Sequence, residues 1–261
     1  MGSGGLVVAG VPAARGLRWW SEAMALLFSS LPRTGVWAGM SMAFLVAQLL
    51  YWLPFVGTLV SFLLTFLLSG GLMIAAEKTR RGQPVFFIDL FAGFGRHGGA
   101  LVSASLIVLL ACVLVTLLIA FVGAGTVLAA AWDAAVRSDA EAFSAEALSL
   151  GWGALAVVLA SLLLFTPVFL AAWLAPALIV LRGVNPVDAL RLSLAAGGRN
   201  FGALTLYGLG GVGVLVLAVM PLLGWLFFFL FFVPLSALST HAAFCDLFEG
   251  GVEVLDAGQT V

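Results

Sequence analysis

The chain has 261 residues, 63% of them hydrophobic and 9% charged, and its formal net charge is -1 at pH 7. Soluble domains are typically about half apolar and about a quarter charged, so this composition excludes an ordinary water-soluble protein. The balanced charge gives no indication of nucleic-acid binding. Apolar stretches of about 18 residues or more are typical of membrane-spanning helices, so we expect an all-α, polytopic membrane protein.

The first element expected in chain order is an amphipathic helix over residues 13–31. Trp20 lies on its apolar side, and Arg15 and Arg18 lie on the other side. An apolar face with tryptophan opposite a basic face is typical of a helix in the lipid headgroup plane. We therefore expect this helix on the membrane surface, preceded by a disordered N-terminus at residues 1–12.

Six apolar stretches follow, each about long enough to cross the hydrocarbon core of a bilayer. The expected spans are residues 36–52, 55–76, 98–122, 152–181, 201–219 and 222–243. Pro167 and Pro176 in the fourth span and Pro234 in the sixth predict kinks, because proline removes a backbone hydrogen bond. Between the third and fourth spans we expect an external insertion at 123–151 with an amphipathic helix at about 129–148.

One sequence pattern occurs three times: an arginine, a polar residue, small residues and then a long apolar run. The three occurrences are Arg33 with Thr34, Arg96 with His97, and Arg199 with Asn200. Repetition of this kind predicts equivalent structural units. Each unit is expected to be a short helix, which we call the elbow helix, followed by a helical hairpin. The units cover about residues 13–82, 84–183 and 185–247.

Together the three units form a single transmembrane domain of six helices over residues 13–247. A cytoplasmic tail at 248–261 follows it. The third elbow helix should begin at Asn185 and Pro186. Asparagine is a good N-cap, and proline is favoured in the first turn of a helix.

The basic residues indicate which ends of the helices face the cytoplasm. Ten of the eleven Lys and Arg residues lie in segments that the repeat makes equivalent: Arg15, Arg18, Arg33, Lys78, Arg80, Arg81, Arg96, Arg182, Arg191 and Arg199. The eleventh, Arg137, lies in the insertion beside Asp133, Asp139 and Glu141. Because basic residues are enriched on the cytoplasmic side, we expect these segments and both termini inside and the insertion outside.

The residue types that carry catalysis are scarce. The chain has two histidines, His97 and His241, and it lacks a nucleophile elbow and a phosphate-binding loop. His241, Cys245 and Asp246 have the helical spacing of half a metal site, but we favour the alternative of an interfacial histidine beside a buried cysteine. We therefore expect no catalytic residues, no cofactor and, in preference to an enzyme, a non-enzymatic protein.

The leading functional hypothesis is a basic cytoplasmic surface that binds anionic lipid or a protein partner. Its residues are Arg33, Arg96, Arg199, Lys78, Arg80, Arg81 and Arg182. Each basic residue near an anionic leaflet contributes about 1 kcal/mol, so several together would hold such lipid without a deep pocket. The structural alternative is that these residues only fix the topology. A second copy of the chain is another partner that the sequence allows.

The second hypothesis is a channel or transporter for a neutral or amphipathic solute. Its pathway would be lined by the polar side chains inside the spans, Gln48, Ser61, Thr65, Ser103, Thr166 and Thr205. The structural alternative for these residues is hydrogen bonding between helices. The expected span cores contain no charged residue, which disfavours proton-coupled transport.

Three segments resemble an uncharacterised family of proteobacterial inner-membrane proteins known by locus tags. They are VPAARGLRWWSEAMALLF at 11–28, SGGLMIAAE at 69–77 and LFAGF at 90–94. The resemblance covers most of the chain and implies a multi-pass protein of the bacterial inner membrane without an assigned activity. The arrangement of elbow helices and hairpins is also distantly similar to the membrane domain of some glycerophosphodiester phosphodiesterases. Their catalytic domain is missing here, so no hydrolase activity is implied.

Overall fold

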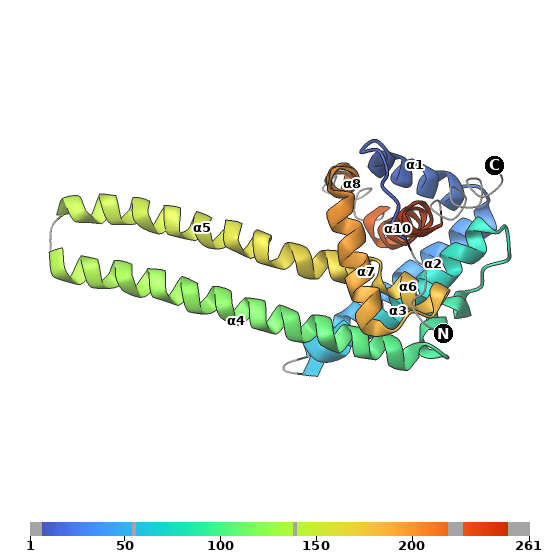
Figure 1. The fold of residues 1–261 in the computed structure, drawn as a ribbon, viewed down its shortest axis with the longest axis horizontal. Coiled ribbons are helices and arrows are strands. Elements are labelled where there is room, and N and C mark those ends of the chain that lie inside the picture. The colour runs from blue at the N-terminus through green and yellow to red at the C-terminus, as the bar shows by residue number, and fades with distance from the viewer. Residues whose placement is uncertain (1–6, 54–55, 138–139, 219–226, 250–261) are drawn as a thin grey trace. The chain divides into compact units, whose positions relative to one another are not determined.

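The structure is a computed structural model that describes residues 7–53, 56–137, 140–218 and 227–249 (Figure 1). The regular elements in those ranges are all helical, which confirms the predicted all-α class. The chain divides into two compact units. The first combines Met1–Leu106 with Leu170–Val261, and the second is Ile107–Phe169.

A short helix precedes a pair of longer helices three times along the chain. In chain order the elements are α1 (Arg15–Leu27), α2 (Leu31–Gln48), η1 (Leu49–Trp52), α3 (Val56–Arg80), η2 (Phe87–Phe94), α4 (Gly98–Arg137), α5 (Ala140–Trp173), α6 (Ala175–Arg182), α7 (Pro186–Arg199), α8 (Phe201–Ala218), η3 (Phe228–Phe232) and α10 (Val233–Phe248). The boundaries of the three repeats stay a prediction. In the second unit, α4 and α5 lie side by side, and a Cβ at Gly123 would be 4.0 Å from Val157 Cγ2 (Figure 1).

Five helical segments are long and apolar enough to cross a membrane, which supports a polytopic helical bundle. They are Leu31–Trp52, Val56–Arg80, Gly98–Gly123, Leu155–Arg182 and Leu230–Phe248. A sixth apolar helix, Phe201–Val216, is shorter. The predicted spans 201–219 and 222–243 both reach into 219–226, outside the described residues, so the number of six stays a prediction.

The connection between the third and fourth spans differs from the prediction. α4 continues to Arg137 and α5 already begins at Ala140, so two long helices replace the separate helix expected at 129–148. The sequence from 123 to 151 contains many alanines and no proline. Alanine is the best helix former, so the helices continue where a break was expected.

The two prolines of the fourth predicted span lie in different settings. Pro167 lies inside α5, whereas Pro176 lies in the first turn of α6, after a break at Leu174. Ser193 of α7 satisfies this break: its Oγ accepts the Leu174 N–H at 3.0 Å and donates to the Leu170 carbonyl at 2.6 Å. Buried backbone groups freed by a helix break need such partners.

The sixth predicted span also changes its helical geometry at a proline. Pro234 lies in the first turn of α10, directly after the π-helical turn η3. A π-helical turn is a common place for a helix to bend. In the third repeat, Asn185 caps α7 as predicted, since its side chain accepts the Asp188 N–H at 2.9 Å.

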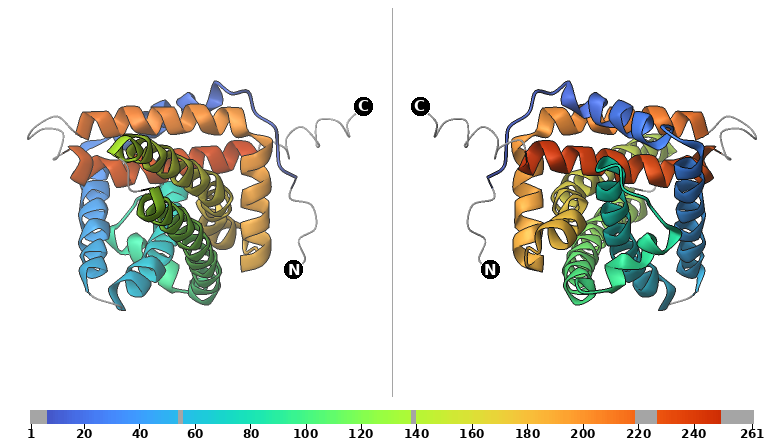
Figure 2. Two further views of the ribbon diagram at one scale, coloured as in Figure 1. Left: turned by 90° about the vertical axis from the view of Figure 1, so that its left-hand side faces the viewer. Right: turned by 90° about the vertical axis from the view of Figure 1, so that its right-hand side faces the viewer.

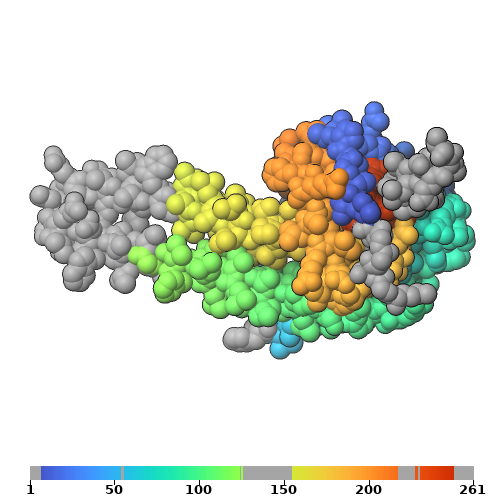
Figure 3. Space-filling view, viewed as in Figure 1, coloured from blue at the N-terminus to red at the C-terminus, as the bar shows by residue number. Residues whose placement is uncertain are grey.

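α1 is present as predicted, but one of its faces packs on protein. It contacts α8 and α10, as the blue, orange and red helices in Figure 2 show and as the adjoining surfaces of α1 and α8 show in Figure 3. Trp19 is fully buried, and Trp20 Nε1 donates to the Tyr207 carbonyl at 2.8 Å. Leu17 and Met24 remain exposed on another side. The expected membrane-facing side is therefore only part of the apolar surface of α1.

The N-terminal segment that precedes α1 is held by Asn200, the polar residue of the third repeat. The Asn200 side chain accepts the Val11 N–H at 2.8 Å and donates to the Ala9 carbonyl at 3.0 Å. The Ala9 N–H donates to the Leu247 carbonyl at 2.8 Å. Residues 7–12 are thus ordered, unlike the disordered N-terminus predicted for 1–12; residues 1–6 and the tail from 250 to 261 lie outside the described residues.

Close backbone contact at glycines joins η2 to α3. A Cβ at Gly71 would lie 1.9 Å from the Leu90 carbonyl oxygen, and one at Gly93 would lie 1.9 Å from the Leu67 carbonyl oxygen. Real Cβ atoms do not approach an oxygen so closely, so only glycine permits this packing. The contact fixes η2 against α3 and positions the basic end of α3.

Replacing Gly71 with alanine should lower the melting temperature of the detergent-solubilised protein. The matched control is Gly208→Ala in α8, where an added Cβ would meet nothing within 4 Å. Alanine favours a helix by about 1 kcal/mol over glycine, so the control should be neutral or stabilised. A Gly71→Ala protein as stable as Gly208→Ala would contradict the close packing of η2 on α3.

Candidate functional site

Polar side chains gather where the ends of α3, α6 and α10 approach one another. α3 and α10 are in contact. α3 ends in polar residues from Glu77 to Arg80, and α10 carries His241 and Cys245 in its second half. Basic residues in the last turn of α3 also suit the negative end of the helix dipole. We call the group formed by Glu77, Arg80, Arg81, Arg182, His241, Cys245 and Glu249 the α3–α10 cluster.

Glu77 is the central residue of the α3–α10 cluster. Its carboxylate accepts hydrogen bonds from His241 Nε2 at 2.8 Å and from Arg80 Nε at 3.1 Å, and it also pairs with Arg81. Only 14% of the Glu77 side chain is exposed. A carboxylate so far removed from water is costly unless donors and cations satisfy it, and here two guanidiniums and an imidazole do so.

His241 and Cys245 lie one turn apart on α10. The His241 side chain is 3% exposed, and its Nδ1 lies 3.7 Å from Cys245 Sγ. One potential ligand atom from each of Glu77, His241 and Cys245 lies within 4.8 Å of the others. Imidazole nitrogen, thiolate sulfur and carboxylate oxygen are the atoms that bind zinc in proteins. The arrangement could therefore hold a metal ion.

Asp246 does not join His241 and Cys245, although the sequence spacing groups the three. Its Oδ2 accepts hydrogen bonds from Arg15 Nε at 2.6 Å and from Trp19 Nε1 at 2.7 Å. The hydrogen bond to Asp246 raises the pKa of Arg15, and burial opposes this rise. Asp246 therefore ties α10 to α1.

Glu77 is the residue of this site that the sequence analysis misses. It is 164 positions from His241 in the chain, and no local spacing connects the two. The available signal was its position as the only acidic residue in the basic run from 77 to 81 at the end of an apolar helix.

Four of the seven basic residues predicted to bind lipid are engaged in ion pairs. The pairs are Lys78–Asp89, Arg80–Glu77, Arg80–Glu249, Arg81–Glu77 and Arg182–Glu249. Three of these cations lie in the α3–α10 cluster, and the fourth, Lys78, joins α3 to η2. Their charges are partly neutralised within the protein, which leaves less of the charge for an external anion.

The three arginines of the repeat have a different environment. Arg33 lies in the first turn of α2, Arg96 lies in the turn before α4, and Arg199 ends α7. Within the described part of the chain, none of the three belongs to an ion pair. Arg96 and Arg199 are exposed, and Arg33 is half-buried. These are the positions where positive charge remains available.

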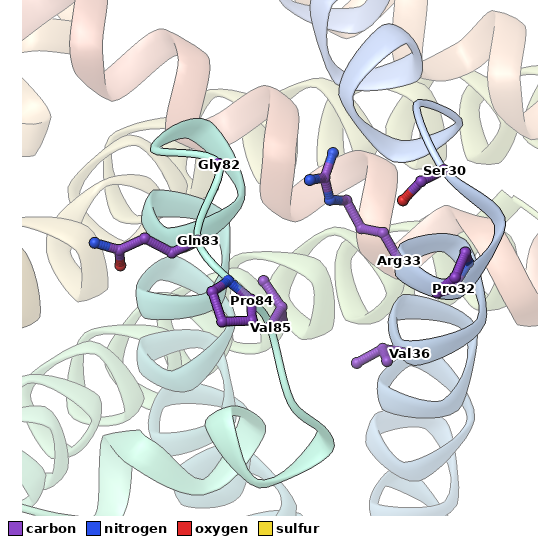
Figure 4. Close-up of a pocket in the computed structure, with 8 residues that line it drawn as sticks. All are labelled: Ser30, Pro32, Arg33, Val36, Gly82, Gln83, Pro84 and Val85. Carbon is purple, nitrogen blue, oxygen red and sulfur yellow. The ribbon is translucent and has the colours of Figure 1, made fainter.

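Arg33 lines an open cavity of about 340 Å³ between the start of α2 and the segment after α3 (Figure 4). We call this cavity the Arg33 groove; its lining residues are Ser30, Pro32, Arg33, Val36, Gly82, Gln83, Pro84 and Val85. The Arg33 side chain extends from α2 toward the turn at Gly82, and its guanidinium also bonds Ser29 Oγ. Gly82 forms part of the groove wall. Its φ is 68°, a conformation that favours glycine.

Three of the six predicted pathway residues lie together. Thr65 Oγ1 donates to the Ser61 carbonyl at 2.8 Å and also lies 3.3 Å from Gln48 Oε1. Gln48 Nε2 and Ser61 Oγ are buried and have no hydrogen-bond partner among the described residues. Unpaired buried polar atoms are rare in folded proteins, so they mark this place as unusual.

The other three predicted pathway residues are exposed, and each is satisfied by its own helix. Their hydroxyls donate to the carbonyl four positions earlier, at distances of 2.9, 2.6 and 2.9 Å for Ser103, Thr166 and Thr205. This bond is the usual way in which serine and threonine are accommodated within a helix. Hydrogen bonding within the helix therefore accounts for these three hydroxyl groups without a solute.

Comparison with known proteins identifies the family of the chain. No family model matches the chain, and no solved structure matches it. A probable inner membrane protein of Burkholderia thailandensis, named by its locus tag, is 31% identical over 219 residues, which cover 78% of each protein. This match and the five apolar helices agree with the resemblance found in the sequence. The chain therefore belongs to the family of this inner membrane protein.

Proposed function

We propose that this inner-membrane protein is non-enzymatic and binds anionic phospholipid, with the headgroup phosphate in the Arg33 groove. The observation that carries the proposal is a half-buried guanidinium without a described carboxylate partner, set in a cavity beside the polar residues Ser30 and Gln83. Arginine suits this task because its planar guanidinium can donate two parallel hydrogen bonds to a phosphate.

The surroundings of the groove favour lipid over a protein partner or a second copy of the chain. Leu31, next to Ser30, is 88% exposed, and Phe86, next to Val85, is 59% exposed. Both flank residues that line the groove. A polar cavity bordered by exposed apolar side chains suits a molecule with an anionic head and apolar tails.

Arg96 and Arg199 extend the same interaction along the cytoplasmic leaflet. Both are exposed arginines at equivalent places of the sequence repeat. Each basic residue near an anionic leaflet adds about 1 kcal/mol, so the three together would retain lipid firmly. Lys78, Arg80, Arg81 and Arg182 would contribute less, because carboxylates already bind them. The cytoplasmic orientation of this face follows from the positive-inside rule.

Arg33→Gln should reduce the retention of phosphatidylglycerol by the purified protein in native mass spectrometry about fivefold, the equivalent of about 1 kcal/mol. The loss should be smaller for phosphatidylethanolamine, because the ammonium group of this zwitterionic lipid offsets the charge of its phosphate. Arg191→Gln is the matched control, because it removes one exposed charge that does not line the groove. Equal phosphatidylglycerol retention by wild type and Arg33→Gln, or an equal loss in Arg191→Gln, would reject the groove as the binding site.

The second candidate function is a pathway for a neutral solute between α2 and α3. The observation that favours it is the pair of buried polar atoms, Gln48 Nε2 and Ser61 Oγ, that lack a partner among the described residues. A passing solute with hydroxyl or amide groups would supply the missing hydrogen bonds. Gln48, Ser61 and Thr65 would then be the residues that contact it.

Ser61→Ala tests that observation, because removal of an unpaired buried hydroxyl should leave the melting temperature unchanged or raise it. Ser105→Ala is the matched control: Ser105 is also buried, but its hydroxyl donates to the Val102 carbonyl at 2.8 Å, so its removal should lower the melting temperature. If Ser61→Ala were as destabilising as Ser105→Ala, the Ser61 hydroxyl would be satisfied within the protein. The second candidate would then lose its support.

A further inference from the structure

We propose that the α3–α10 cluster is a metal site in which His241 Nδ1 and Cys245 Sγ bind a divalent ion of the zinc class. Glu77 holds the imidazole from its other nitrogen. The proposal is independent of lipid binding at the Arg33 groove. It rests on the positions of these side chains on α10 and α3.

The separation of the two main donor atoms suits a shared metal ion. Cys245 Sγ and His241 Nδ1 are 3.7 Å apart. Zinc lies about 2.3 Å from a thiolate sulfur and about 2.0 Å from an imidazole nitrogen, so two such ligands of a tetrahedral ion are roughly 3.5 Å apart. The spacing i and i+4 places both ligands on one face of α10, as in known helical zinc motifs. The two donor atoms therefore need little change in their separation to share the ion.

Glu77 determines which imidazole nitrogen faces the ion. A carboxylate can only accept a hydrogen bond here, so the contact of 2.8 Å between Glu77 Oε2 and His241 Nε2 places the ring proton on Nε2. Nδ1 then presents its lone pair toward Cys245. Histidine ligands commonly donate their other N–H to a carboxylate in this way, which orients the ring and strengthens it as a ligand.

Glu77 is a positioning residue and not a ligand in this arrangement. It already binds Arg80 and Arg81 as well as His241 Nε2. A metal ion between Glu77 and Nε2 would have to displace the hydrogen bond and would lie against two guanidiniums. An ion on the Nδ1 side leaves all of these bonds in place, so that side is the favoured one.

Glu249, one turn beyond Cys245, is engaged elsewhere: its carboxylate is held by Arg182 at 2.9 Å and by Arg80 at 3.2 Å. The protein ligands are therefore the imidazole and the thiolate, and water would complete the coordination of the ion. Binding of the ion breaks the S–H bond of Cys245: the proton leaves to water, and the sulfur electron pair forms the bond to the metal.

The test is a titration of the purified, full-length protein in detergent with Co²⁺, which reports thiolate ligation by a charge-transfer band in the near ultraviolet. Wild type should show this band at one Co²⁺ per chain, and added Zn²⁺ should abolish it. Cys245→Ser should lose the band, whereas the matched control Cys112→Ser should keep it. Absence of the band in wild type, or its persistence in Cys245→Ser, would overturn the proposal.

Two further measurements separate ligation from an effect on folding. In wild type, bound Zn²⁺ should slow the reaction of Cys245 with a maleimide at least tenfold and leave Cys112 unaffected; no protection of Cys245 would also overturn the proposal. Glu77→Gln should keep the cobalt band but weaken Co²⁺ binding about 10- to 100-fold, as expected for loss of the group that orients a histidine ligand. Unchanged Co²⁺ affinity in Glu77→Gln would remove Glu77 from the site.

Discussion

The hydrogen bond between Glu77 and His241 is the interaction on which the polar end of the first unit depends. It joins residues 164 positions apart and fixes the end of α3 against α10. The same carboxylate holds Arg80 and Arg81, and Arg80 in turn reaches Glu249. Glu77 and His241 are the most buried members of this network, so loss of either one leaves the other without its partner in a place that water reaches poorly.

The ion pairs divide the seven basic residues predicted to bind lipid into two groups. The cations near Glu77 serve internal carboxylates and shape the surroundings of His241 and Cys245. The arginines of the sequence repeat stay outside the network, and Arg33 opens onto a groove beside exposed apolar side chains. The two proposals therefore concern different residues. Metal binding depends on the internal network, and lipid binding depends on the arginines that are not part of an ion pair.

Much of the fold follows from local sequence, but the candidate site does not. Hydropathy predicted the all-α membrane protein, and capping rules predicted the start of α7 at Asn185. The sequence analysis expected a separate amphipathic helix at 129–148 and did not predict that α4 and α5 continue through the connection. Neither the contact of Glu77 with His241 nor the backbone contact at Gly71 has a local signature, since both depend on which helices meet in space.

A double-mutant cycle on Glu77 and His241 tests the central interaction most directly. The free energy of unfolding of wild type, Glu77→Gln, His241→Gln and the double variant would be measured by titration of the detergent-solubilised protein with sodium dodecyl sulfate. Residues in direct contact within one network should show a coupling energy of about 1 kcal/mol or more, the double variant losing less stability than the sum of the single ones. Additive losses, within about 0.5 kcal/mol, would contradict the account.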